Sequence, residues 1–198
     1  MVGEIRDVET AQIAIQSALT GHLVFTTVHA NNVFDVLGRF LNMGVEPYLV
    51  ASSLEAVLAQ RLVRLLCPQC KQVDTTAEAR DFKVKIGVKP EATVYRAVGC
   101  RECRNTGYHG RRAIFEWMDS DNEIRELILK SASTDIIRDA ARRGGMKTLA
   151  EDGWRLVRAG ITTVEEVLSV TTSNVPVPPA FRITCRSVGT SYGSPKPA

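Results

Sequence analysis

Two Cys-x-x-Cys pairs constrain the fold of this chain more than any other feature of its sequence. The four thiols belong to Cys67, Cys70, Cys100 and Cys103. Each pair can supply two neighbouring ligands of a tetrahedral metal, and four thiolates around Zn²⁺ make a common structural site. The segment between the pairs exceeds the roughly 15 to 20 residues of the commonest four-cysteine spacing, so it must loop out or form a small element of its own. We therefore predict a zinc site at these four cysteines.

Other roles for the cysteines stay open on the spacing alone. Two disulfides, a redox-active Cys-x-x-Cys pair and four unrelated buried thiols are the alternatives. The sequence begins without the basic and apolar regions of a signal peptide, and it contains no apolar run of about 20 residues that would span a membrane. We therefore expect a cytoplasmic protein, where reducing conditions favour zinc over disulfides. We interpret Cys185, which lies in a different kind of sequence, as a free thiol.

The net charge of +3 is located at the end of the chain. After Asn174 the charged side chains are all basic, namely Arg182, Arg186 and Lys196. Residues 1–174 are therefore electrically balanced, which argues against a general basic field that attracts nucleic acid, and we expect no direct nucleic-acid partner. A zinc-ribbon nucleic-acid binder is a rival hypothesis that would depend on Arg101, Arg104, Tyr108, Arg111 and Arg112.

The first part of the chain reads as alternating strand and helix. Residues 1–5 are typical of the end of a buried strand, Asp7 is a good N-cap for a helix, and Gly21 is placed to end that helix. Residues 22–29 are rich in β-branched and aromatic types and short, as in a buried parallel strand. This order predicts a βαβ unit in an α/β fold.

Two further helices and a strand follow before the first cysteine pair. Asn31 or Asn32 can cap a second helix that Gly44 closes, and Pro47 opens a third helix that we expect to run to about Ala59. Residues 60–66 are predicted as a strand. Between the cysteine pairs we expect a short helix at 75–86, and after them a strand at 111–118.

The C-terminal third is predicted to be helical. Three capping boxes mark helix starts, at Ser120 with Glu123, Thr148 with Glu151 and Thr162 with Glu165. With a further helix at 135–143, the pattern predicts four short helices in a C-terminal helical bundle. Residues 175–198 are rich in proline, serine and glycine, and we expect them to have no fixed structure.

Two polar clusters stand at the carboxyl ends of the predicted strands, where α/β folds carry their chemistry. Glu4 lies at the end of the first strand, as in a Walker B element, and Thr27 and His29 share one side of the second, with His22 on the opposite side. A solvated turn glutamate and a histidine that makes one hydrogen bond are the plain alternatives. The phosphate-binding motif Gly-x-x-x-x-Gly-Lys-Ser/Thr is absent from all 198 residues.

Long ordered motifs carry a resemblance to a known family. They are Gly3-Glu-Ile-Arg-Asp-Val-Glu-Thr-Ala11, Ala18-Leu-Thr-Gly-His-Leu-Val-Phe-Thr-Thr-Val-His-Ala-Asn31, Gln60-Arg-Leu-Val-Arg-Leu-Leu-Cys-Pro-Gln-Cys-Lys71, Cys103-Arg-Asn-Thr-Gly-Tyr-His-Gly-Arg-Arg112, Gly145-Met-Lys-Thr-Leu149, Asp152-Gly and Thr162-Thr-Val-Glu-Glu-Val167. Over about residues 1–172 the chain resembles the secretion ATPases that power type II secretion and type IV pilus assembly. The cysteine segment resembles the assembly and secretion branch of the family. Its residues are more similar to those of the type II secretion member than to those of the pilus member.

The resemblance implies a RecA-like, parallel-sheet ATPase domain of a homo-hexamer that uses ATP and Mg²⁺. Glu4 would match the Walker B glutamate and His29 the catalytic His-box residue, with Thr27 and His22 as nucleotide-binding neighbours. Cys67, Cys70, Cys100 and Cys103 would hold Zn²⁺ in a small projecting subdomain. The implied partners are the inner-membrane platform and the cytoplasmic adaptor proteins of the secretion apparatus. Membrane association would be peripheral, through these partners, at the cytoplasmic face of the bacterial inner membrane.

The resemblance also implies four regions: a partial RecA-like core at 1–66, a tetracysteine subdomain at 67–118, a helical subdomain at 119–174 and the tail at 175–198. Because phosphoryl transfer needs the phosphates and metal held together, we expect a chain without the phosphate loop to be inactive alone. A fragment of a type IV pilus assembly or DNA-uptake ATPase, and a non-enzymatic zinc-containing interaction module, are the alternative functions.

Overall fold

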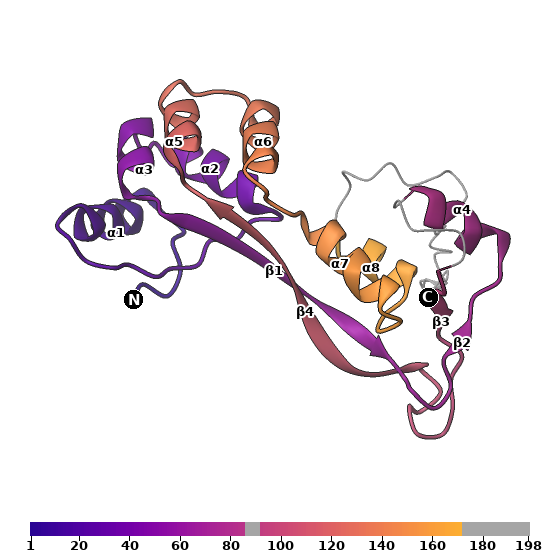
Figure 1. The fold of residues 1–198 in the computed structure, drawn as a ribbon. Coiled ribbons are helices and arrows are strands. Elements are labelled where there is room, and N and C mark those ends of the chain that lie inside the picture. The colour runs from indigo at the N-terminus through magenta and orange to yellow at the C-terminus, as the bar shows by residue number, and fades with distance from the viewer. Residues whose placement is uncertain (86–91, 172–198) are drawn as a thin grey trace, which may run out of the picture.

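A long two-stranded antiparallel ribbon organises the computed structural model, which describes residues 1–85 and 92–171 (Figure 1). Strand β1 (Ala56–Leu66) pairs with β4 (Tyr108–Asp119), and the register is irregular between Arg64 and Leu66. At the far end of the ribbon β2 (Gln72–Val73) pairs with β3 (Tyr95–Arg96). The helices are α1 (Val8–Leu19), α2 (Val33–Asn42), α3 (Pro47–Ser53), α4 (Ala77–Lys85), α5 (Asn122–Leu129), α6 (Thr134–Arg143), α7 (Leu149–Arg158) and α8 (Val164–Val170).

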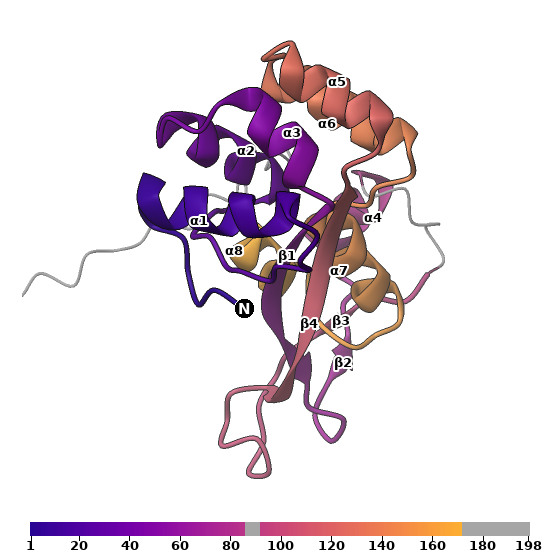
Figure 2. The ribbon, with the colours of Figure 1, turned by 90° about the vertical axis from the view of Figure 1, so that its left-hand side faces the viewer.

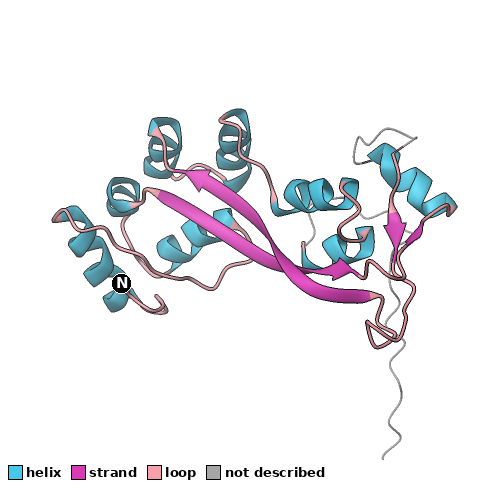
Figure 3. Cartoon of the chain, turned by 60° about the horizontal axis from the view of Figure 1, so that its bottom comes forward, coloured by secondary structure: helices cyan, strands magenta, loops and turns pink. Residues whose placement is uncertain are grey.

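The two faces of the ribbon differ, because successive strand side chains point to opposite faces. On one face Val57, Val63, Ile114 and Met118 are buried against helices. The opposite face carries large exposed apolar side chains, namely Leu58, Leu62, Phe115 and Trp117. Figure 3 shows that the ribbon is long and strongly twisted. The buried face of the ribbon is therefore the one on which helices pack.

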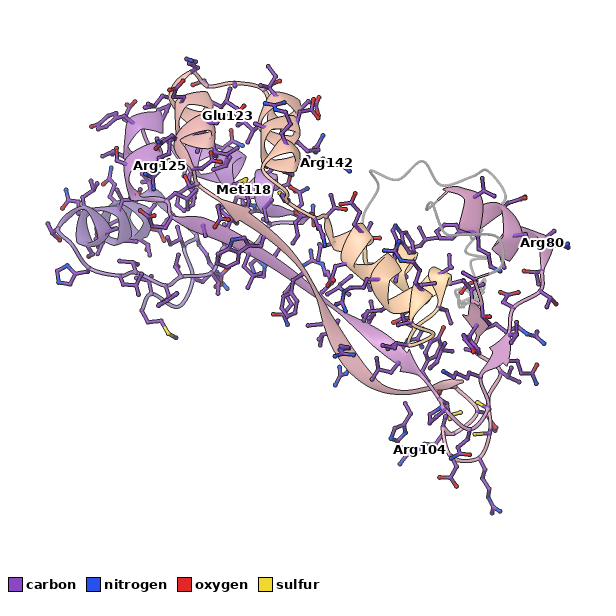
Figure 4. All side chains as sticks on the ribbon, viewed as in Figure 1. Arg80, Arg104, Met118, Glu123, Arg125 and Arg142 are labelled. Carbon is purple, nitrogen blue, oxygen red and sulfur yellow. The ribbon has the colours of Figure 1, made fainter. Side chains whose placement is uncertain are left out.

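A first hydrophobic cluster covers the end of the ribbon that contains Val57 and Met118. Helices α1, α2, α3, α5 and α6 contribute to it, and they gather at that end of the ribbon in Figure 2. On its surface Arg143 of α6 pairs with Glu123 of α5, and Arg125 of α5 pairs with Glu55. Glu123 and Arg125 are labelled in Figure 4. Surface ion pairs of this kind contribute little, so apolar burial is the main force that holds this end together.

A second hydrophobic cluster covers the part of the ribbon that contains Val63 and Ile114. Helices α4, α7 and α8 pack here, with Phe82 edge-on to Trp154 at 4.9 Å between ring centroids. The four C-terminal helices exist as predicted, but they do not pack as one bundle. Helices α5 and α6 belong to the first cluster, where they pack on α3 and α2, whereas α7 and α8 belong to the second and pack on the ribbon itself.

The helix starts follow local side-chain capping. Asp7 and Thr148 are N-caps as predicted, and Thr148 with Glu151 forms a complete capping box. Of the two candidates Asn31 and Asn32, Asn32 caps α2. The other two predicted boxes are wrong by one residue. The N-cap of α5 is Asp121 rather than Ser120, and the N-cap of α8 is Thr163, which accepts from the N–H of Glu166.

The predicted parallel strands at 1–5 and 22–29 are not formed as strands. Two backbone hydrogen bonds join these extended segments, from Val2 N–H to Phe25 O and from Ile5 N–H to Thr27 O, both 2.9 Å. Both bonds run from the first segment to the second, so they do not make a reciprocal ladder, and Leu23 and Phe25 are 76% and 63% exposed. Within the described residues the paired strands are antiparallel.

Two more predictions differ from the structure or lie outside it. Helix α3 ends at Ser53 rather than near Ala59, because pairing with β4 takes the chain into an extended conformation from Ala56. The helix expected at 75–86 is α4, and the tail at 175–198 lies outside the described residues. No helix among the described residues is both long and apolar enough to cross a membrane.

Candidate functional sites

The four cysteines meet at the far end of the ribbon. Cys67 follows β1, while Cys100 and Cys103 lie in the loop that leads into β4. All four Sγ atoms lie within 4.8 Å of one another, and the closest pairs are 3.7 to 3.9 Å apart. A tetrahedron with Zn–S bonds of about 2.3 Å has S···S edges of about 3.8 Å, whereas a disulfide needs about 2.05 Å. The spacing therefore fits a tetrahedral metal, and the described cysteines are free.

Backbone N–H groups point at the sulfurs. Cys103 Sγ accepts from the N–H of Cys100 at 3.1 Å and of Gly107 at 3.2 Å, and Cys70 Sγ accepts from Gly99 N–H at 3.3 Å. Gly99 and Gly107 have φ of +116° and +76°. A Cβ on Gly107 would also lie 2.6 Å from Ala97 Cβ. Glycine is required at Gly107 both for its backbone conformation and for this close approach.

The thiols of Cys70 and Cys103 have very different proton affinities. Burial raises the pKa of Cys70, and although Gly99 N–H opposes this, the neighbouring thiols raise it further, to about 11. Burial also raises the pKa of Cys103, but the N–H groups of Cys100 and Gly107 and the neighbouring thiols lower it overall, to about 6. The thiolate is the form that binds a metal, and the surroundings of Cys103 stabilise it.

The turn between α7 and α8 supports the cysteine cluster. Lys71 Nζ donates to Gly160 O at 2.9 Å, and Leu66 N–H donates to Ile161 O at 2.8 Å. Just before the first cysteine, Arg64 donates to the buried Glu166 carboxylate through its backbone N–H, Nε and Nη2 at 3.0, 2.9 and 2.6 Å. Figure 4 shows the sulfur atoms beside Arg104, at the end of the ribbon. The cluster is thus attached to the second hydrophobic cluster by several independent contacts.

The second candidate site lies at the N-terminal segments. Glu4 Oε1 lies 3.2 Å from His29 Nε2, and Glu4 Oε2 lies 2.6 Å from Arg6 Nη2. The hydrogen bond from Arg6 lowers the pKa of Glu4, and the charges of Arg6 and His29 lower it further. Thr27 Oγ1 donates to Gly3 O at 2.7 Å and so joins the same two segments.

The structure brings Glu4, Thr27 and His29 together but places His22 elsewhere. His22 Nδ1 lies 3.1 Å from Ser17 O and 3.2 Å from Thr20 Oγ1, at the C-terminal end of α1. A cavity of about 410 Å³ lies beside Trp117 and Lys147, and no predicted site residue lines it. Neither the cysteine cluster nor Glu4 lines that cavity.

Two residues near His29 were not found from the sequence. Glu116 of β4 is buried, and Arg61 of β1 contacts the backbone directly after His29. The available signal was a glutamate at a position that strand alternation assigns to the apolar face, between Ile114 and Met118.

Comparison with known proteins gives consistent matches. The family described as Type II/IV secretion system protein matches residues 1–169. The type II secretion system protein E of Pseudomonas aeruginosa is 49% identical over 173 residues, which cover 86% of this chain and 34% of that protein. The type IV pilus assembly ATPase PilB of Myxococcus xanthus is 45% identical over 175 residues, covering 86% of this chain and 31% of that protein. The chain thus spans about a third of the length of these relatives.

A solved structure shows the same fold. The pilus retraction motor PilT with bound ADP superposes with a TM-score of 0.57 at 21% identity, covering 87% of this chain and 40% of that chain. The architecture described above is therefore an α/β ATPase fold.

Proposed function

The chain belongs to the type II/IV secretion system protein family, and we propose that it is part of a hexameric traffic ATPase that couples ATP hydrolysis to pseudopilus assembly in type II secretion. The observation that carries the nucleotide side of this proposal is the 3.2 Å approach of Glu4 and His29 from two adjacent segments. In this proposal residues 1–66 are part of a RecA-like core, and the motor acts at the cytoplasmic face of the inner membrane, on its platform and adaptor partners.

Each residue of the N-terminal site has a proposed role in that motor. Glu4 would act near Mg²⁺ or the attacking water, since its lowered pKa keeps it a carboxylate at neutral pH. His29 would contact the γ-phosphate. Thr27 would hold the two segments together through Gly3 O, and His22, at the end of α1, would act at the margin of the nucleotide site.

The cysteine cluster would hold Zn²⁺ through Cys67, Cys70, Cys100 and Cys103. Four thiolates leave no open coordination position, so the ion would supply structural rigidity and no reaction step. In this proposal the rigid end of the ribbon meets the membrane platform. The region boundaries at 66, 118 and 174 remain part of the proposal.

The pilus branch is a second candidate function. Identities of 49% to a type II secretion relative and 45% to a pilus assembly relative are close to each other, which favours neither branch strongly. We prefer the secretion branch because the motifs around Cys67 and Asp152 are more similar to those of the type II secretion member.

Titration with nucleotide tests the proposed function. The ring signals of His29 are followed by NMR in the 198-residue chain while Mg-ATP or Mg-ADP is added to millimolar concentration. We expect ATP to shift the His29 signals more than ADP, because the γ-phosphate is the group that His29 would contact, and we expect negligible turnover by the chain alone. Equal effects of ATP and ADP, or none, would refute the role of His29. Turnover comparable to that of an intact relative would refute the expectation that this chain holds only half of the site.

A further inference from the structure

Glu116 occupies an unusual position on the ribbon. Its side chain is on the buried face of β4 and is 4% exposed. The buried residue before it on that face, Ile114, belongs to the second hydrophobic cluster, and the one after it, Met118, belongs to the first. Opposite Glu116 in the register stands Ala59, which packs against both clusters and leaves room for the carboxylate. Glu116 therefore lies at the boundary between the two clusters.

The carboxylate of Glu116 joins two helix N-termini. Oε1 accepts from the N–H of Val33 at 3.0 Å, and Oε2 accepts from the N–H of Leu149 at 3.1 Å. Val33 is the first residue of α2 and Leu149 the first residue of α7. Both N–H groups have no partner within their own helix, and both helix dipoles favour a negative charge at this point. The two helix ends thus balance a buried charge that would otherwise be costly.

Arg61 holds the backbone between His29 and α2 from the other strand of the ribbon. Its Nη2 donates to Ala30 O at 3.4 Å and to Asn31 O at 3.3 Å. Residues 30 and 31 come directly after His29, and Asn32 then caps α2. The segment that follows His29 is therefore held at one end by Arg61 of β1 and at the other by Glu116 of β4.

We propose that Glu116 and Arg61 are positioning residues that hold His29 in place, and that Glu116 ties the helix after His29 to α7. A displacement of His29 would move α2, and α2 can move away from α7 only by breaking a hydrogen bond to a buried carboxylate. The role of His29 in contacting nucleotide rests on the proposed function, whereas the placement of His29 by these two residues does not.

Amide hydrogen exchange in the nucleotide-free chain tests the proposal. Glu116→Ala removes both acceptors, and Val167→Ala is the control, since Val167 is fully buried in the second cluster, away from His29. We expect Val33 N–H and Leu149 N–H to exchange at least about tenfold faster in Glu116→Ala than in a control of equal global stability. We also expect the His29 ring signals to shift in Glu116→Ala and to stay unchanged in Val167→Ala.

Two milder variants keep the test decisive if Glu116→Ala does not fold. Glu116→Gln retains one acceptor and should release one of the two N–H groups. Arg61→Lys loses the Nη2 group that donates to both Ala30 O and Asn31 O, and it should shift His29 without affecting Leu149. If exchange at Val33 follows global stability in all these variants and the His29 signals do not move, the two residues are structural only and the proposal is wrong. If placement changes as expected but nucleotide leaves His29 unaffected, the proposed function fails while this inference stands.

Discussion

At Cys103 a thiolate exists at neutral pH before any metal binds. Its pKa is lowered to about 6, whereas the pKa of Cys70 is raised to about 11. Metal binding must displace a proton from any ligand that still carries one, so metal affinity falls as the solution becomes acidic. The two thiols differ in the pH range in which they add to this dependence. Cys70 contributes throughout the neutral range, and Cys103 contributes only below about pH 6.

This difference predicts the pH profile of zinc binding. A thiol whose pKa is lowered has already lost its proton above that pKa. Above about pH 6, metal binding therefore displaces no proton from Cys103. Below about pH 6 its proton must be displaced, and the slope of log affinity against pH should steepen by about one. Competition with a chelator of known affinity, from about pH 8 to about pH 5, measures this slope. Cys185→Ser should leave the curve unchanged and Cys103→Ser should abolish tight binding. A constant slope through pH 6 would contradict the assignment.

The positions of some residues were predictable from the sequence. The cysteines come together as their Cys-x-x-Cys pattern indicates, and Glu4 meets His29 because both lie near the ends of two neighbouring extended segments. Glu116 could not be assigned in this way. Its function depends on the N-termini of α2 and α7, which are distant from it in sequence and meet it only through packing on the ribbon.

At the scale of elements, the start of α8 shows why two capping boxes were wrong by one residue. Thr162 and Thr163 are equally good caps by type, and tertiary contacts choose between them. The hydroxyl of Thr162 donates to Arg64 O at 2.7 Å, so Thr163 is left as the cap and Glu166 takes the position expected for Glu165. Likewise Ser120 is buried, its N–H donates to Glu55 O, and its neighbour Asp121 caps α5. Local sequence cannot reveal these competing demands.

The neighbouring glutamates of α8 give a matched pair of variants. Glu166 is 6% exposed and accepts three hydrogen bonds from Arg64, whereas Glu165 is exposed. Glu166→Gln should lower the free energy of unfolding by about 2 kcal/mol, because it weakens charge-assisted bonds to a half-exposed arginine. Glu165→Gln should change it by less than about 0.5 kcal/mol. Urea unfolding at unchanged m-value measures both. Equal effects of the two variants would favour the capping box predicted from the sequence, Thr162 with Glu165, which starts one residue earlier.

At the scale of the whole molecule, the ribbon explains what the sequence could not show. Strands β1 and β4 were predicted in part, at 60–66 and 111–118, but no local pattern reveals that they pair with each other across the cysteine region. That pairing creates one long apolar face, on which α7 and α8 pack directly, whereas α5 and α6 pack on α3 and α2 in the other cluster. The α/β class and the helix sequence were predictable from periodicity and caps. The pairing depends on contacts distant in sequence, and the bundle prediction failed for that reason.

The separation of the two clusters predicts how the chain responds to metal removal. The cysteine cluster is joined to the second hydrophobic cluster through Lys71 with Gly160 and Leu66 with Ile161, at the turn between α7 and α8. Chelation of zinc should therefore speed amide exchange in the cysteine loops first and in the α7–α8 turn next. Helices α1 to α3 bury their side chains in the first cluster and should keep their protection.

Hydrogen exchange followed by mass spectrometry, with and without a chelator, resolves these regions. Lys71→Ala provides the matched comparison, because it removes the contact to Gly160 O and leaves all four cysteines in place. In that variant the turn between α7 and α8 should already exchange faster with zinc bound, and chelation should add less to it than in the unaltered chain. A uniform loss of protection through α1 to α3 on chelation would mean that the ribbon makes the two clusters one cooperative unit. Exchange confined to the cysteine loops would mean that the α7–α8 turn does not depend on the metal.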